Sequence, residues 1–137
     1  MFFAGFWEDH DSRYWFYSKT IFFEVWFYAR SLHASNKKVV ISLGKDAAAQ
    51  NQAIQVESDR IILIYGSNKS YSATINTNQW YHVKCGSDGS LAGSYMEVNG
   101  SSVTLTGSDT TPVDPVSPVR RIGQDQYGSA RAFDGLI

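Results

Sequence analysis

Short segments of alternating apolar and polar residues follow one another along this chain, with turn residues between them. A period of two is typical of strands with one buried face, whereas a helix needs apolar residues at a period near 3.6. The segments recur about every ten residues, and none has a convincing helical period. We expect strands at residues 19–30, 38–44, 53–57, 60–65, 70–75, 80–85, 95–98, 102–106, 119–123 and 131–137.

Turn residues mark where these strands reverse. Asn99-Gly100 readily supplies the positive φ values of a two-residue type I′ hairpin, and Ser58-Asp59 marks a second hairpin. Residues 47–52 are expected to form a loop or a short helical turn. All three prolines lie within residues 109–118, which we therefore expect to be a long surface crossover. The pattern predicts an all-β fold, a two-sheet antiparallel β-sandwich of jelly-roll type.

Both faces of the first predicted strand are largely apolar. One face carries Ile21, Phe23, Val25 and Phe27, and the other carries Phe22, Glu24, Trp26 and Tyr28. Such a strand is either covered on both sides or has an aromatic outer face. An aromatic outer face could bind sugar, or it could pack against a second sheet or subunit. Large aromatic residues in sheets are most often core, so we expect packing.

The size and charge of the chain limit its function classes. A chain of 137 residues has room for one core, so we expect a single domain over residues 1–137. The net charge is −1 and the densest basic clusters are two pairs, Lys37-Lys38 and Arg120-Arg121, so binding to nucleic acid through its phosphates is not expected. No apolar run of about 18 residues predicts a membrane span, and no signal peptide is visible. The single cysteine, Cys85, is expected to be a small buried residue rather than a reactive thiol.

Five motifs occur in an order that resembles a known superfamily. They are FFEVWF at 22–27, QWYHV at 79–83, MEVNG at 96–100, VRRIGQD at 119–125 and FDGLI at 133–137. Their order and spacing resemble those of the laminin-G-like, concanavalin A-like jelly-roll superfamily, over about residues 20–137. The resemblance implies a β-sandwich, and the superfamily includes both lectin-like modules and glucanases.

The resemblance also bears on the end of the chain. In that family the motif at residues 133–137 normally continues into a long closing strand, so we expect the closing C-terminal strand of this domain to be incomplete. The apolar side chains of Leu136 and Ile137 are expected to be buried away from water. They could be buried in the core, against a longer polypeptide, or against a neighbouring chain that adds a strand to the open edge.

Candidate catalytic residues are few. A glycosidase needs two carboxylates on either side of the scissile bond. The nearest pair, Glu57 and Asp59, falls on a predicted hairpin turn, while Glu24 and Glu97 each stand alone on their strands. His82 is expected to be a hydrogen-bonded structural residue beneath the sheet. We therefore predict that the protein is not an enzyme, and a glucanase that uses Glu57 and Asp59 is the third hypothesis.

Calcium is implied by the resemblance, because many laminin-G-like modules hold one ion at the rim of the sandwich. Asp88, in a Gly-Ser-Asp-Gly turn, and Asp125, after Ile122-Gly123, carry the hard oxygen ligands that Ca²⁺ takes. The alternative is that both residues shape their turns by hydrogen bonds to nearby backbone.

A carbohydrate ligand would use exposed aromatic rings as apolar platforms and polar side chains as hydrogen-bonding partners for its hydroxyls. The candidate ligand-binding residues come from predicted loops and strand ends, and their alternative role is packing. They are Trp7, Trp15, Tyr71, Asn78, Tyr127 and Arg131.

The sequence thus predicts a non-catalytic recognition module that binds carbohydrate or glycoprotein, outside the cell or on the surface of a particle. The alternative is a structural module of an extracellular or viral particle. That module would dock through the open C-terminal strand and the aromatic N-terminal segment, since thirteen aromatic residues lie between Phe2 and Tyr28.

Overall fold

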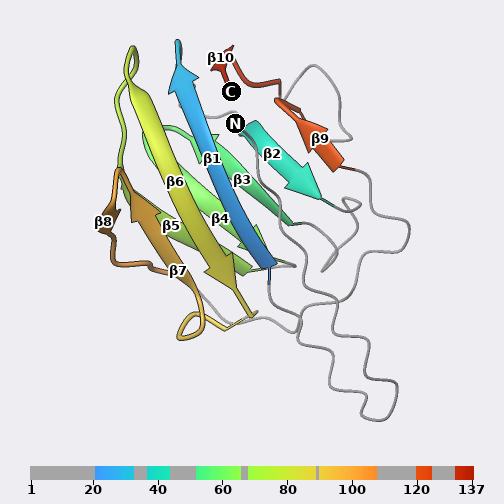
Figure 1. Ribbon diagram of the computed structural model, residues 1–137, viewed down its shortest axis with the longest axis vertical. Helices are drawn as coiled ribbons and strands as arrows, with labels where there is room; N and C mark the ends of the chain where they lie inside the picture. The colour runs from blue at the N-terminus through green and yellow to red at the C-terminus, as the bar shows by residue number, and fades with distance from the viewer. Residues whose placement is uncertain are drawn as a thin grey trace.

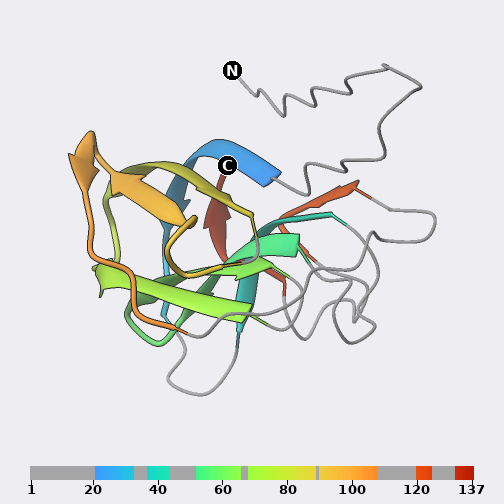
Figure 2. The same cartoon turned by 90° about the horizontal axis from the view of Figure 1, so that it is seen from below.

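The described part of the protein consists mainly of two antiparallel sheets stacked as layers (Figures 1 and 2). The computed structural model describes residues 21–32, 37–43, 52–65, 68–88, 90–107, 120–124 and 132–137, and of residues 68–73 it describes the backbone. Within these ranges there is no helix, and hence none long and apolar enough to cross a bilayer. The all-β sandwich that the sequence predicts is therefore confirmed.

Within the described ranges each sheet has five strands. The first sheet has the order β10-β1-β6-β7-β8, and the second has the order β5-β4-β3-β2-β9. The strands are β1 (Ile21–Ala29), β2 (Lys38–Leu43), β3 (Gln52–Glu57), β4 (Arg60–Tyr65), β5 (Asn68–Thr74), β6 (Trp80–Ser87), β7 (Tyr95–Val98), β8 (Ser101–Ser102), β9 (Arg120–Ile122) and β10 (Gly135–Leu136).

The main core lies between the two sheets. β1 contributes Phe27, which has no exposed surface, together with the other odd-numbered residues of the strand. The ring of Phe27 stacks on Tyr81 of β6 with centroids 5.6 Å apart and meets Phe133 edge to face. From the second sheet, Ile54 and Leu63 fill the same core. Apolar alternation in β1 therefore produces one buried face, as a period of two requires.

The outer faces of the two sheets differ. On the second sheet, Ala53, Ile62 and Ile64 form a buried apolar cluster on the side away from the main core. On the first sheet, the even-numbered residues of β1 are half-buried or exposed. The expectation that the aromatic residues of this face are packed is wrong for Trp26, which is 52% exposed. Of the two possibilities for this strand, coverage on both sides or an aromatic outer face, the structure has the aromatic outer face.

Both predicted hairpins are confirmed, with differences at the strand ends. Asn99 and Gly100 have φ values of 53° and 78°, and Ser58 has a φ of 56°. The strand expected at residues 102–106 is shorter and earlier, since β8 covers Ser101–Ser102. Gln52, expected in a loop or helical turn, is the first residue of β3. The predicted crossover at residues 109–118 lies outside the described residues.

The last described residues connect the two sheets (Figure 1). Ala132 forms a parallel bridge with Val39 of β2, and Phe133 packs against the core. β10 then pairs with β1, opposite Tyr28 and Ala29. The expected strand at residues 131–137 is therefore reduced to two residues. Leu136 and Ile137 remain 46% and 42% exposed, so the core does not receive them.

Candidate functional site: an aromatic face on the first sheet

Strand register gathers aromatic side chains on the outer face of the first sheet. Trp26 of β1 lies opposite His82 of β6, and Tyr28 lies opposite Trp80. Side chains at directly opposite positions in a sheet project from the same face. Trp26, Tyr28, Trp80 and His82 therefore form one surface, which we call the aromatic face. Both tryptophans are well exposed, Trp26 at 52% and Trp80 at 49%.

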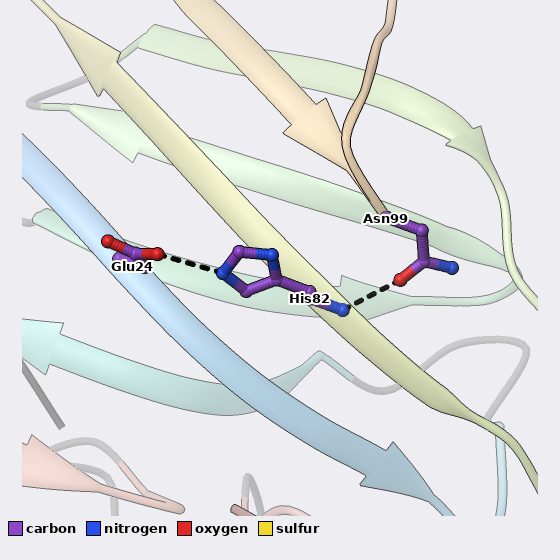
Figure 3. A network of polar contacts seen from close by, with 3 residues as sticks. All are labelled: Glu24, His82 and Asn99. Carbon is purple, nitrogen blue, oxygen red and sulfur yellow. Dashed lines mark hydrogen bonds and ion pairs between the residues drawn. The ribbon is translucent and has the colours of Figure 1, made fainter. Parts of the chain in front are cut away.

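In one half of the aromatic face, Trp26 stacks on His82, which is paired with Glu24. The Trp26 and His82 rings are stacked with centroids 4.4 Å apart and planes 15° apart. His82 Nε2 lies 2.9 Å from Glu24 Oε1, and the two side chains are 21% and 34% exposed. Figure 3 shows Glu24 and His82 reaching toward each other from neighbouring strands. The carboxylate fixes the imidazole, and the imidazole in turn supports one face of the indole.

The backbone beneath His82 is fixed by a hairpin. The His82 N–H donates to Asn99 Oδ1 at 2.8 Å (Figure 3). The Asn99 N–H in turn donates to the His82 carbonyl oxygen at 2.8 Å. Asn99 holds a left-handed φ of 53°, which asparagine tolerates better than most residues. The β7–β8 turn thus acts as a clamp on the strand that carries His82.

The other half of the aromatic face pairs Tyr28 with Trp80. Their centroids are 5.7 Å apart and their planes are tilted by 56°. The Tyr28 hydroxyl donates to Asn78 Oδ1 at 3.5 Å, and the Asn78 N–H donates to the Ala29 carbonyl oxygen at 2.8 Å. Asn78, a ligand-binding residue predicted from the sequence, therefore lies at the end of the aromatic face. The side-chain nitrogen of Asn78, Nδ2, takes part in neither of these two hydrogen bonds.

A row of charged residues borders the aromatic face. Glu24 of β1, Lys84 of β6 and Glu97 of β7 lie opposite one another across three strands. Glu24 and Glu97 each stand alone on their own strands, as expected, yet strand pairing brings them into one row. Sheet order, which a single sequence does not reveal, places the two on either side of Lys84. His82 is hydrogen-bonded as expected, but it lies on the outer face rather than beneath the sheet.

Beyond the charged row a further aromatic side chain crosses the sheet. Tyr95 of β7 lies opposite Gly86 of β6, and a Cβ on Gly86 would approach the Tyr95 ring within 2.6 Å. The absence of a side chain at Gly86 therefore lets the tyrosine lie across β6. Partial burial there raises the pKa of Tyr95.

The other predicted ligand-binding residues do not join Asn78. Tyr71 lies on β5 of the second sheet, where it pairs with Ile62, and its side chain is not described. Trp7, Trp15, Tyr127 and Arg131 lie outside the described residues.

Asp88 follows β6 at the end of the strand remote from Asn78, so eight strand residues separate the two. At about 3.3 Å per residue that is a distance of about 26 Å. The structure therefore does not bring Asp88 to the aromatic face. One ligand cannot touch both residues unless it extends along the whole strand.

Asp88 has the hydrogen bonds of a turn residue. Its Oδ1 accepts from the Ser90 N–H at 2.9 Å and from the Ser90 hydroxyl at 2.7 Å. Those two bonds lower the pKa of the Asp88 carboxyl. Calcium takes six to eight oxygen ligands, and the described residues contain no group of three acidic, histidine or cysteine side chains that could hold a metal. Asp125 lies outside them, so the described donors around Asp88 do not by themselves make a calcium site.

The carboxylates of the glucanase hypothesis lie at a hairpin end. Glu57 is the last residue of β3, and Asp59 is in the turn, where it lies 4.0 Å from Arg60. Both Asp59 and Arg60 are more than half exposed.

Cys85 is fully buried, and burial raises the pKa of its thiol. It is a small core residue, as expected.

The tryptophans of the aromatic face were not among the ligand-binding residues predicted from the sequence. Their signal was present in part, because the even-numbered residues of β1 were recognised as an aromatic face. Its role depends on two further facts, that β1 lies between β10 and β6 and that Trp26 is 52% exposed. Neither fact follows from the periodicity of one strand.

Comparison with known proteins agrees with this architecture. The model of a laminin G-type family, described as the concanavalin A-like lectin/glucanases superfamily, matches residues 10–137. The chain belongs to this superfamily. A search of curated proteins gave no significant match. The superfamily description covers both lectins and glucanases, so membership leaves the choice between binding and catalysis to the site itself.

Proposed function

We propose that this domain is a non-catalytic recognition module that binds carbohydrate through the aromatic face. The observation that carries the proposal is the pair of half-exposed tryptophans, Trp26 and Trp80, on one sheet surface. Exposed aromatic rings match the apolar faces of sugar rings, and a few fixed polar groups give orientation. Glu24 and Asn78 are such groups at the two ends of the surface.

The rigidity of the surface also favours recognition. Each exposed tryptophan rests on a partner ring, His82 or Tyr28, which is itself held by a polar contact. A side chain that is already ordered loses less conformational entropy when a ligand binds. Membership of a superfamily that includes lectins supports the same proposal.

Catalysis has weaker support. Asp59 is exposed at a turn beside Arg60. In the charged row, Lys84 lies between Glu24 and Glu97, and Glu24 is already paired with His82. We therefore assign no reaction to these carboxylates. A reducing-sugar assay on soluble glucans tests this assignment, and hydrolysis that disappears in Glu57→Gln or Glu24→Gln would contradict it.

A glycan-array screen tests the proposed function. Wild-type protein should bind defined glycans, and Trp26→Ala and Trp80→Ala should each lower the binding at least about tenfold, a loss of about 1.4 kcal/mol. Ile122→Ala is the matched control, because Ile122 is a large apolar residue with 54% exposure on β9 of the other sheet. Binding that survives both tryptophan changes would contradict the site.

The same screen with and without EDTA tests the calcium prediction. Calcium at Asp88 and Asp125 follows from the family resemblance, and it stays a prediction. Three results together would support it: EDTA abolishes binding, added calcium restores binding, and Asp125→Asn does not bind even with calcium present.

We also propose an extracellular or particle-surface location, since that is where carbohydrate recognition of this kind operates.

A second candidate function is assembly with a neighbouring chain. The observation that favours it is the exposure of Leu136 and Ile137 beside the short edge strand β10. An exposed edge with apolar side chains can accept a strand from a partner. Light scattering over a concentration series tests this candidate. Oligomers that Leu136→Asp dissociates would support assembly, whereas a monomer at all concentrations would exclude self-assembly through this edge.

A further inference from the structure

The spacing of the two tryptophans carries information about the ligand. Trp26 lies opposite His82, and Trp80 is two residues from His82 on the same strand. Trp26 and Trp80 are therefore diagonal neighbours across β1 and β6, with Cα atoms about 7–8 Å apart. Because each ring belongs to a different strand, the two present separate stacking positions rather than one shared pocket.

Each tryptophan has a side that its partner covers and a side that stays open. His82 stacks parallel to Trp26, so a ligand ring can reach the indole on its other face. Tyr28 is tilted against Trp80, which keeps 49% of its surface exposed. A single sugar on either position would be held from one side, and ligands held in this way bind weakly because little of their surface is buried.

Polar groups lie at both ends of this diagonal. Glu24 and His82 form a pair beside Trp26, and Asn78 lies beside Tyr28 at the Trp80 end. Figure 3 shows the Glu24–His82 pair side by side on the outer face of β1 and β6. Two stacking positions with a hydrogen-bonding group at each end suit a ligand with repeated rings and hydroxyls along its length.

We propose that the ligand of the aromatic face is a linear glycan chain, bound with two nearby sugar rings on Trp26 and Trp80. This inference rests on the proposed function, and it adds the class of carbohydrate. Linking two weak contacts through one ligand makes the second contact intramolecular, so affinity rises steeply once the chain spans both positions. A monosaccharide or the tip of a branched protein glycan gains nothing from the second position.

Calorimetric titration with length series tests the proposal. The probes are glucose with cello- and laminari-oligosaccharides, mannose with manno-oligosaccharides, and N-acetylglucosamine with chito-oligosaccharides, each from one to six units. In the series that binds, the affinity should rise at least about tenfold between one and four units and then level off. Trp26→Ala and Trp80→Ala should each remove this gain, while Ile122→Ala should retain it.

The outcomes separate the two proposals. Equal affinity for one and six units, or selective binding of branched protein glycans on an array, would overturn the linear-chain inference and leave carbohydrate recognition intact. Failure of every glycan to bind would overturn both. A dimer that Trp80→Ala converts to monomer would also overturn both, because the face would then be an interface between protein chains.

Discussion

At the scale of single residues, His82 links the polar and aromatic parts of the surface. Its ring meets Glu24 on one side and stacks on Trp26, and its backbone is clamped by Asn99. Glutamate, histidine and tryptophan at these positions were visible in the sequence. Their association was not, because it depends on which strands are neighbours.

The Asn99 turn gives a matched pair of substitutions. Asn99→Ala places an ordinary side chain at a φ of 53° and removes the acceptor of the His82 N–H. We expect the free energy of unfolding to fall by about 2 kcal/mol. Asn99→Gly removes the same acceptor without the steric cost, so it should lose only about 0.5–1 kcal/mol. Urea unfolding measures both values, and equal losses would contradict the role given to the left-handed φ.

The pKa of Asp88 gives a pH-dependent prediction. Hydrogen bonds from Ser90 lower this pKa in the folded state, so the ionised carboxylate stabilises the loop. The contribution is present above the ordinary pKa of aspartate and is lost as the pH falls through the lowered value. In an NMR titration, the Ser90 amide should shift at a pH below that of a model aspartyl peptide. In Asp88→Asn this acid shift should be absent, and a midpoint at or above that of the peptide would contradict the prediction.

At the scale of elements, the chain segment around β10 ties the two sheets together. The Phe133 N–H donates to the Gly123 carbonyl oxygen at 2.7 Å, on the side of β9. The Arg30 N–H donates to the Asp134 carbonyl oxygen at 2.9 Å, and the Ser31 hydroxyl donates to the Asp134 carboxylate at 2.6 Å. A two-residue strand is thus held by contacts from both layers.

Gly135→Ala should detach this element. A Cβ at Gly135 would collide with the Tyr28 carbonyl oxygen and with the ring of Phe133. We expect the Arg30 amide, which donates to Asp134, to lose at least about tenfold of its hydrogen-exchange protection, whereas amides of β1 that pair with β6 keep theirs. Gly100→Ala is the control, since a Cβ there meets nothing and the change adds only backbone strain. Unchanged protection of Arg30 would contradict the prediction.

The sequence predicted elements better than it predicted their partners. Short runs of aromatic and branched apolar residues between turns found β1, β4 and β6, and Asn99-Gly100 found the β7–β8 turn, because these signals are local. The short strands β8 and β10 have few ladder hydrogen bonds, so tertiary pairing rather than sequence decides their ends. The charged row was missed for the same reason, as it exists only after three strands align.

At the scale of the whole molecule, the two sheets share one core and differ on their outer faces. Phe27 is central to that core, since it is fully buried and touches the rings of Tyr81 and Phe133. The outer face of the same strand carries part of the aromatic face, which we propose as the binding surface. Under this proposal, one alternating segment serves both stability and binding.

This division predicts unequal effects along β1. Phe27→Ala should lower the free energy of unfolding by about 3–5 kcal/mol, as is usual for deleting a buried aromatic side chain. Phe22→Ala, on the half-buried outer face of the same strand, should cost less than half of that. Trp26→Ala should leave stability within about 1 kcal/mol of wild type. Chemical unfolding measures all three, and a Trp26 effect as large as that of Phe27 would show that Trp26 is structural.

The central claim is that ligand meets the molecule on the aromatic face of β1 and β6. The most direct measurement is an NMR titration of the four indole N–H signals with the best-binding glycan, after assignment by single Trp→Phe changes. The account predicts that the signals of Trp26 and Trp80 shift together and saturate at the same ligand concentration. Shifts confined to Trp7 and Trp15, with Trp26 and Trp80 unmoved, would contradict it.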